Sequence, residues 1–151
     1  MYPGALRALE WDQIVEVVRG FALTPPGAAR LAELEPQSDP HRVSQLLAAT
    51  AEGVKYLDTN PAFSLPAPED LEAVAPLAVE GRALEPVRLL AFAEFLDSLG
   101  LTCAAIRRAS GPFPTLKALA ESCGSFKNQI AEVRSKIDPS GEVNDNASPD
   151  L

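Results

Sequence analysis

Few residues of this chain have the type and spacing of a catalytic site. The single histidine, His41, follows Asp39-Pro40 at a predicted helix start and has no partner in the local sequence that would make it a general base. A solvated helix residue is the favoured interpretation of His41. The sequence holds no GxxxxGK[ST], GxGxxG or GxSxG motif for phosphate binding, dinucleotide binding or acyl transfer. We therefore predict no catalytic and no cofactor-binding residue in this chain.

Three carboxylates lie close together around a glycine near the end of the chain. Asp138, Glu142 and Asp145 could in principle hold a divalent cation, but their spacing does not match a calcium loop. Asp, Pro and Gly at the first, second and fourth positions of residues 138–141 favour a β-turn instead. We predict the turn and no metal site.

The two cysteines, Cys103 and Cys123, stand on apolar helical positions. They form neither a CxxC motif nor a zinc-ligand spacing. A disulfide between them is possible from sequence, and two buried thiols in a reducing compartment is the favoured interpretation.

Basic residues gather in residues 103–136. That stretch holds six basic and two acidic residues, a net charge of +4 in a chain whose net charge is −8. Our candidate nucleic-acid contacts all lie there: Arg107, Arg108, Lys127, Arg134 and Lys136. Solvated helix faces are the favoured alternative. Because an acidic chain repels phosphate overall, we expect weak or no DNA binding by this chain alone.

Composition and periodicity predict an all-α protein. Apolar residues make up 46% of the 151 residues and aromatic residues only 6%, so the core must consist mostly of aliphatic helix formers. We expect a compact bundle of about six to seven helices. No leader is evident, and no window of about 18 uncharged apolar residues predicts a membrane span. We therefore expect a cytoplasmic protein with no membrane partner.

Cap and breaker residues divide the chain into predicted helices. The ranges are 6–21, 25–35, 40–57, 69–80, 86–106, 115–123 and 126–137. A proline-rich loop over residues 60–68 separates the third helix from the fourth, and Pro76 predicts a kink or early stop in the fourth. The face predicted to be buried in the third helix comprises Val43, Leu46, Leu47, Thr50, Val54 and Leu57.

The clearest element is a heptad stripe in the fifth predicted helix. Its members are spaced alternately three and four residues apart: Leu89, Phe92, Leu96, Leu99, Cys103 and Ile106. Such a stripe requires a facing helix.

The last residues predict the start of another helix. Ser148 suits an N-cap and Pro149 suits the first helical position, but the sequence ends at Leu151. We therefore expect the front portion of a longer protein, with a helical core over 1–137 and a turn and truncated helix start over 138–151.

Ordered motifs along the whole chain resemble the second bacterial MutS family, MutS-II. Matching positions in the front half are Leu9-Glu10-Trp11, Ile14, Gly20, Ala22, Thr24, Gly27, Pro36, Asp39, Thr50 and Glu52. Those in the back half are Gly81, Leu84, Ile137-Asp138, Gly141-Glu142-Val143, Asp145, Ala147-Ser148-Pro149 and Leu151. The last group resembles the segment that precedes the long lever helix of that family. The proline-rich loop at residues 60–68 departs from the pattern.

The resemblance implies a function for the whole protein that these residues do not themselves encode. MutS-II proteins are ATP-driven homodimers with lever, clamp and ATPase domains, and many carry a C-terminal Smr nuclease domain. They are linked to suppression of recombination on branched DNA and to splitting collided ribosomes. The resemblance implies ATP and Mg²⁺ as cofactors of the full-length parent, and none in this fragment.

Two functions remain open at this stage. The first is a non-catalytic core segment that supports the lever and relays the state of the ATPase, with the remaining domains of its own chain as partners. The alternative is a stand-alone acidic helical module that binds partner helices.

Overall fold

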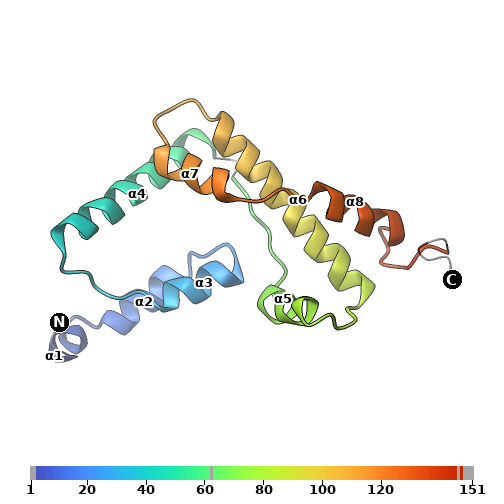
Figure 1. The fold of residues 1–151 in the computed structure, drawn as a ribbon. Helices are drawn as coiled ribbons and strands as arrows, with labels where there is room; N and C mark the ends of the chain where they lie inside the picture. Colours follow the sequence, from blue (N-terminus) through green and yellow to red (C-terminus); the bar gives the residue numbers. More distant parts are fainter. Residues whose placement is uncertain (1–2, 62, 146, 148–151) are drawn as a thin grey trace.

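The computed structural model describes residues 3–61, 63–145 and 147, and these residues form an all-α bundle (Figure 1). The described part contains eight helices: α1 (Pro3–Ala8), α2 (Trp11–Arg19), α3 (Pro25–Ala32), α4 (Pro40–Thr59), α5 (Leu71–Val79), α6 (Pro86–Arg108), α7 (Pro114–Ser122) and α8 (Lys127–Lys136). The all-α prediction is confirmed.

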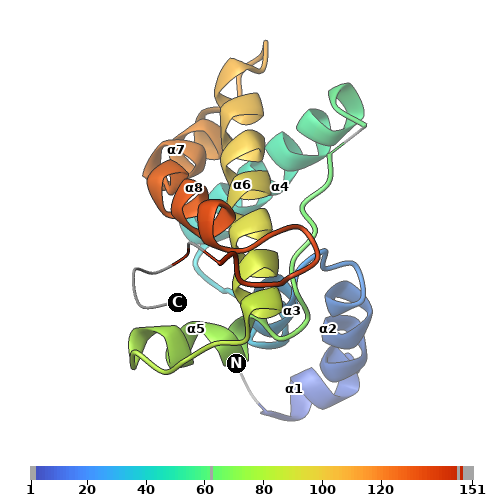
Figure 2. The ribbon, with the colours of Figure 1, turned by 90° about the vertical axis from the view of Figure 1, so that its right-hand side faces the viewer.

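The helices pack in two groups. In the first, α2 packs on both α1 and α3, and α3 also contacts α5. In the second, α6 packs on both α7 and α8, and α7 also contacts α4. We call these the α2 group (α1, α2, α3, α5) and the α6 group (α4, α6, α7, α8). In Figures 1 and 2 the α2 group occupies the lower part of each view, with α5 as its member nearest the lower end of α6, and α4 and α7 lie beside the upper part of α6.

Several predicted start and stop signals act as expected. The Thr24 hydroxyl accepts a hydrogen bond from Gly27 N–H at 3.2 Å, and the Asp39 carboxylate accepts one from His41 N–H at 2.9 Å. Each cap precedes a proline in the first turn of α3 or α4. Gly81 ends α5 with a φ of 70°, a left-handed conformation that favours glycine. Pro76 lies inside α5, which continues to Val79.

The first predicted helix is instead two helices. The prediction ran from residue 6 to 21, but the chain turns at Leu9 and Glu10, where Glu10 has a φ of 51°. A left-handed glutamate costs free energy, so tertiary contacts must offset it. Trp11 supplies one of them, because its indole Nε1–H donates to the Leu34 carbonyl at 3.1 Å.

The predicted buried face of α4 is wrong. Tyr56 is the buried residue of α4, whereas Leu46, Leu47, Val54 and Leu57 are exposed. Helical periodicity identified a real apolar stripe, but α4 packs on α7 through a different face. A 20-residue helix thus presents its most apolar side to solvent.

The heptad stripe of α6 has the facing helix that it requires. Leu89, Phe92 and Leu96 lie against Phe126, Ile130 and Val133 at the α8 side, and all six line one apolar cavity of about 280 Å³. Cys103, farther along the stripe, is buried. The stripe therefore organises the α6 group.

α6 is also, among the described helices, long and apolar enough to cross a membrane, with a mean hydropathy of 1.7. Length and composition alone are weak evidence, because core helices of bundles meet the same criteria. Both α7 and α8 pack along α6, and Asp97 in its middle pairs with Arg134 of α8 at 2.8 Å. Of the apolar window in α6, 11% is buried within the described structure.

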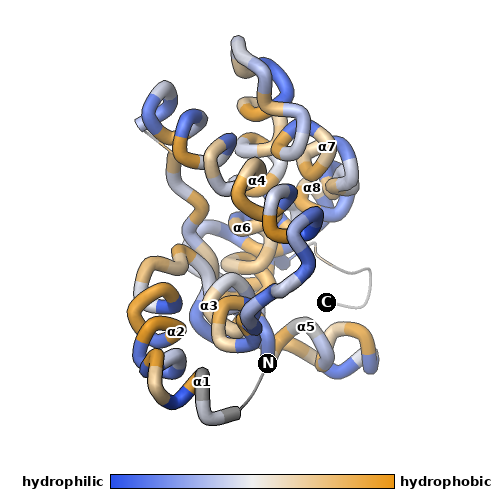
Figure 3. Tube along the Cα trace, turned by 90° about the vertical axis from the view of Figure 1, so that its left-hand side faces the viewer, coloured by the Kyte–Doolittle hydropathy of each residue, from blue (hydrophilic) through white to orange (hydrophobic). Residues whose placement is uncertain are grey.

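The core is small for the mass of the chain. Among the residues whose burial the structure describes, nine apolar side chains are buried: Tyr56, Leu71, Val74, Ala93, Cys103, Phe113, Ala120, Ile130 and Ile137. The accessible surface is 11074 Å², whereas a compact 16 kDa monomer would expose about 7400 Å². Figure 3 shows hydrophobic segments in both groups, including α2 and α5 at the periphery. Much apolar surface is therefore available for contact.

The predicted turn at residues 138–141 is present. Gly141 N–H donates to the Asp138 carbonyl at 3.0 Å, and the Asp138 carboxylate accepts from Ser140 N–H at 2.8 Å. Ile137 and Val143 then form an isolated antiparallel bridge. The predicted helix start at residues 148–151 lies outside the described residues.

Candidate functional site

Three of the five candidate nucleic-acid contacts have partners within the chain. The Arg107 guanidinium donates to the Ala120 carbonyl at 2.8 Å and so ties α6 to the end of α7. Arg134 pairs with Asp97 at 2.8 Å, and Lys136 pairs with Glu132 one turn earlier at 2.9 Å. These contacts give the three side chains structural roles that the sequence did not reveal.

The other two candidates are Arg108 and Lys127. Both are exposed, Arg108 at the last position of α6 and Lys127 at the first position of α8. Neither forms a side-chain hydrogen bond or ion pair with the described residues. Among the five candidates, these two are the cations that remain available to a polyanion.

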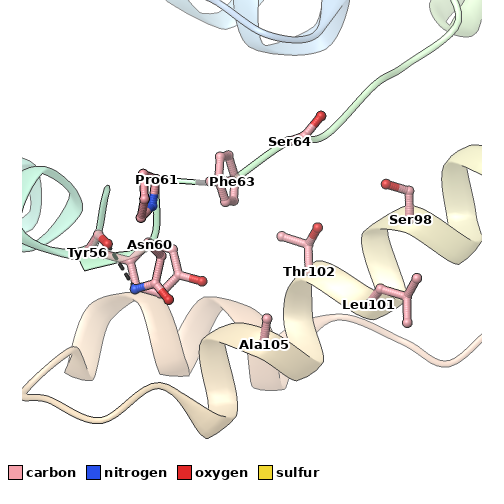
Figure 4. Close-up of a pocket in the computed structure, with 9 residues that line it drawn as sticks. All are labelled: Tyr56, Asn60, Pro61, Phe63, Ser64, Ser98, Leu101, Thr102 and Ala105. Carbon is pink, nitrogen blue, oxygen red and sulfur yellow. Dashed lines mark hydrogen bonds between the residues drawn. The ribbon is translucent and has the colours of Figure 1, made fainter. Parts of the chain in front are cut away.

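A cavity of about 410 Å³ lies between α6 and the loop that follows α4 (Figure 4). Tyr56, Asn60 and Phe63 line one side, and Thr102 and Ala105 of α6 line the other. The Tyr56 and Phe63 rings meet edge to face with centroids 6.2 Å apart. The Asn60 amide donates to the Tyr56 carbonyl at 2.9 Å, which fixes the loop on the end of α4.

The lining of this cavity combines apolar surface with polar side chains. Its polar groups are chiefly hydroxyls, among them those of Ser64, Ser98 and Thr102, and its lining holds no carboxylate, imidazole or thiol. The cavity supplies apolar surface and hydrogen-bonding hydroxyls.

Glu52 forms the polar contact that joins α4 to α7. Its carboxylate accepts hydrogen bonds from Leu116 N–H at 2.7 Å and Thr115 N–H at 3.1 Å, in the first turn of α7. Burial acts to raise the pKa of the Glu52 carboxyl, but these hydrogen bonds lower it and leave the pKa below its ordinary value of 4.5. The carboxylate thus serves as the N-terminal cap of a helix 63 residues away.

Sequence reasoning missed this contact because no local signal reveals it. The N-cap residue of α7 is Phe113, whose side chain cannot accept a hydrogen bond from the helix. This missing cap is the one hint in the sequence that another residue caps α7. One helical turn after Glu52, Tyr56 packs edge to face on Phe113, with ring centroids 5.4 Å apart. One face of α4, carrying Glu52 and Tyr56, therefore holds the start of α7.

No metal-binding cluster is present in the described part of the chain, where no three His, Cys, Asp or Glu side chains are grouped as a metal ion requires. Asp138 uses its carboxylate within the turn, where its bonds to the Ser140 hydroxyl and the Glu142 amide hold its pKa below the usual range.

Comparison with known proteins places this helical architecture in a family context. The chain is 33% identical over 146 residues to the endonuclease MutS2 of Symbiobacterium thermophilum, covering 97% of this chain and 18% of that protein. It is 30% identical over 149 residues to the endonuclease MutS2 of Thermomicrobium roseum, covering 97% of this chain and 19% of that protein. With the endonuclease MutS2 of Pelotomaculum thermopropionicum the identity is 26% over 147 residues.

The chain is a MutS-II-like N-terminal region. It spans about a fifth of the length of the curated relatives it matches. No family model matches the chain, and no solved structure matches it. The resemblance deduced from the ordered sequence motifs is thus confirmed, and the MutS-II-like region is an all-α fragment with two packed groups of helices.

Proposed function

We propose that this MutS-II-like region is the non-catalytic N-terminal core segment of an ATPase, and that its function is mechanical. The observation that carries the proposal is similarity over 97% of this chain to proteins about five times as long, all described as endonuclease MutS2. The sequence itself contains no GxxxxGK[ST] motif. ATP and Mg²⁺ would therefore act in the remaining part of the parent.

The α6 group supplies the rigidity that a relay requires. α6 is 23 residues long and holds α7 and α8 through buried Ala93, Cys103 and Ile130. The Arg107 and Arg134 contacts add polar ties from α6 to both neighbours. A body packed in this way moves as a unit, so it can transmit rotation from an ATPase to a lever and clamp.

The exposed apolar faces are the contact surfaces that a core segment needs. On α4, Leu47 is 65% exposed and Val54 is 56% exposed, and on α2 Val17 is 65% exposed. Apolar surfaces of this extent usually mark contacts with other protein. We assign them to the lever, clamp and ATPase domains of the same chain.

The parent would be a cytoplasmic homodimer that acts on branched DNA or on collided ribosomes, with an Smr nuclease domain in those members that carry one. Suppression of recombination and ribosome rescue are then activities of the whole protein. The N-terminal segment contributes support and not chemistry to either.

A chimera tests the mechanical role. The matching N-terminal residues of the Symbiobacterium thermophilum relative are replaced by this chain, and the homodimer and its ATP hydrolysis are measured. We expect the chimera to form the dimer and hydrolyse ATP, whereas the relative without its N-terminal fifth should lose both. A chimera that behaves like the truncated protein would refute the proposal.

The matched control is the same chimera with Phe113→Ala, which removes a fully buried ring from the α6 group. It should fail like the truncation. The Phe21→Ala chimera alters an exposed ring and should keep the fold of this segment, so any loss of activity there would assign α2 to a domain contact.

Nucleic-acid binding by this chain alone should be weak or absent. The test is the double variant Arg108→Glu with Lys127→Glu, because neither side chain forms a hydrogen bond or ion pair with the described residues. Fluorescence anisotropy with labelled branched DNA should give the same low signal for the unmodified chain and for the double variant. Salt-dependent binding that the double variant abolishes would instead make these residues a nucleic-acid contact.

A second candidate function, a helical interaction module, is favoured by one observation. The exposed stripe of α4 keeps near-heptad spacing through Val43, Leu47, Thr50, Val54 and Leu57 along a 20-residue helix. A free module with such a seam should self-associate at micromolar concentration. Light scattering of the isolated chain distinguishes the two, because a monodisperse monomer counts against the module.

A further inference from the structure

The two cysteines of the chain approach each other where α7 ends beside α6. Cys103 is buried on the α6 stripe, and Cys123 is the half-buried residue that directly follows α7. Both are free thiols, and both line one cavity of about 310 Å³. Twenty residues of sequence separate them, yet the packing of α7 on α6 brings them together.

The Cys123 thiol contributes to the electrostatic surroundings of Cys103. Burial raises the pKa of Cys103, the neighbouring Cys123 thiol raises it further, and Arg107 acts in the opposite direction. Cys123 is held in place by a hydrogen bond from its Sγ to the Leu119 carbonyl at 3.5 Å. The pair is therefore an asymmetric one, with an inner thiol kept protonated and an outer thiol open to solvent.

The surroundings of the outer thiol are basic. Arg107 and Lys127 line the same cavity as Cys123, and Arg107 is fixed there by its bond to the Ala120 carbonyl at 2.8 Å. Reactive cysteines occur in electropositive, partly exposed surroundings of this kind. No carboxylate other than Asp97 lines this cavity, and Asp97 is paired with Arg134.

The backbone differs at the two cysteines. Cys103 is fixed inside α6, whereas Cys123 has the extended conformation φ −71°, ψ 127° and is followed by Gly124. A non-helical residue can shift to reach disulfide geometry without breaking helical hydrogen bonds. The connection between α7 and α8 supplies that freedom.

We propose that Cys103 and Cys123 form a redox modification site, in which a hydroperoxide converts the dithiol into an intramolecular disulfide between α6 and the end of α7. The Cys123 thiolate attacks a peroxide oxygen, the O–O bond breaks, and the sulfenic acid of Cys123 forms as hydroxide or alkoxide leaves. Cys103 then attacks the Cys123 sulfur, the S–S bond forms, the S–O bond breaks and water leaves. Two thiols lose two electrons in total, and one peroxide is reduced.

The disulfide would fasten α7 to α6 covalently. That junction is where Arg107 already joins the two helices. Because α7 also receives α4 through Glu52, oxidation would tighten the whole α6 group. A dithiol reductant would reverse the change.

The experiment treats the chain with hydrogen peroxide and blocks remaining thiols with an alkylating agent. We expect an intact mass lower by two hydrogen atoms and free of alkyl groups. Trypsin without reductant should release residues 89–107 joined to residues 118–127, since cleavage sites separate the two cysteines. The melting temperature should rise by roughly 5–10 °C, and dithiothreitol should remove the rise.

Two single variants separate the roles of the thiols. Cys103→Ala should accumulate a Cys123 sulfenic acid that dimedone traps, and Cys123→Ser should give neither a sulfenic acid nor a disulfide at the same peroxide dose. Cross-linked dimers in place of the intramolecular product, dimedone trapping at Cys103, or two alkylated thiols after treatment would each overturn the proposal. None of these readouts depends on the proposed MutS-II function.

Discussion

The α6 group and the α2 group are built from similar helices but differ in how they are held together. The α6 group buries seven of the nine buried side chains, including Phe113 and Tyr56. The two buried residues of the α2 group, Leu71 and Val74, both come from α5, and neither α2 nor α3 buries any residue. Stability should therefore reside in the α6 group.

Most polar contacts between helices lie within the α6 group, and one ion pair, between Arg88 of α6 and Asp70 at the start of α5 at 3.4 Å, connects the two groups. Glu52, Arg107 and Arg134 join helices of the α6 group to one another. Among the described residues of the α2 group, the long-range side-chain hydrogen bond is that from Trp11 to the Leu34 carbonyl. The comparison teaches that helix formation is a poor guide to rigidity, because equally clear helices differ in whether other elements enclose them.

The largest effect should come from the buried ring of the α6 group. Phe113→Ala should lower the free energy of unfolding by about 3–5 kcal/mol, since it removes a fully buried aromatic side chain and leaves a cavity. Phe21→Ala, at a ring that is 80% exposed in the α2 group, should change it by less than about 0.5 kcal/mol. Urea denaturation followed by circular dichroism measures both. Equal losses would abolish the distinction between the groups.

Glu52→Gln should give the next effect, because the neutral amide is a weaker acceptor for the two α7 amide protons. The folded pKa of Glu52 is depressed, so its contribution is present above the ordinary value of 4.5 and is lost as the pH falls through the folded pKa. The variant should therefore lose this part of the acid dependence.

The measurement is the urea midpoint from pH 7 to pH 3 for both proteins. Glu121→Gln, at an exposed carboxylate on α7, is the matched control and should follow the unmodified chain. A pH profile of Glu52→Gln that overlays the unmodified chain would contradict the capping role.

The division into groups should also appear as two unfolding transitions. Trp11 is the single tryptophan and lies in the α2 group, so its fluorescence reports that group alone. Its transition should occur at lower urea than the circular dichroism change, which reports helices of both groups. Coincident transitions would indicate one cooperative unit.

Within the α2 group, Trp11→Phe should remove the hydrogen bond to Leu34 while keeping an aromatic ring. We expect a loss of about 0.5–1.5 kcal/mol. Hydrogen exchange should show faster amide exchange in α2 and α3 and unchanged exchange in α8. Faster exchange in both groups would show that they are coupled.

The smallest effect should come from the Arg134–Asp97 pair. Both side chains are nearly half exposed, and such pairs contribute about 0.2–1 kcal/mol. A double-mutant cycle with Arg134→Ala and Asp97→Ala measures the coupling. A coupling energy above about 2 kcal/mol would show that this ion pair behaves as a buried pair and contributes to the core of the α6 group.

The sequence predicted where helices begin and end better than which face they bury. Asp39-Pro40 and Thr24-Pro25 are local signals, since a cap side chain and its amide lie within three residues. The inward face of α4 depends on Glu52 and Tyr56 meeting α7, which is about 60 residues away, so periodicity selected the more apolar side instead.

Prediction of the candidate site was limited in the same way, because the partners of its residues are distant in the sequence. Counting charges located Arg107 and Arg134 correctly in a basic stretch. It could not show that Arg134 faces Asp97, 37 residues earlier, or that Arg107 binds a backbone carbonyl. The resemblance to MutS-II was accessible from sequence because it depends on the order of motifs and not on packing.

Gly141 determines how the segment after α8 is attached to the bundle. Its φ is 86°, and a side chain at this position would collide with Val87 in the first turn of α6. Asn144 then binds the Lys136 carbonyl through its N–H at 2.8 Å and the Ser135 carbonyl through its side-chain amide at 3.0 Å. The segment after α8 is thus held against α6 and α8 together. A displacement of this segment would therefore act on both helices at once.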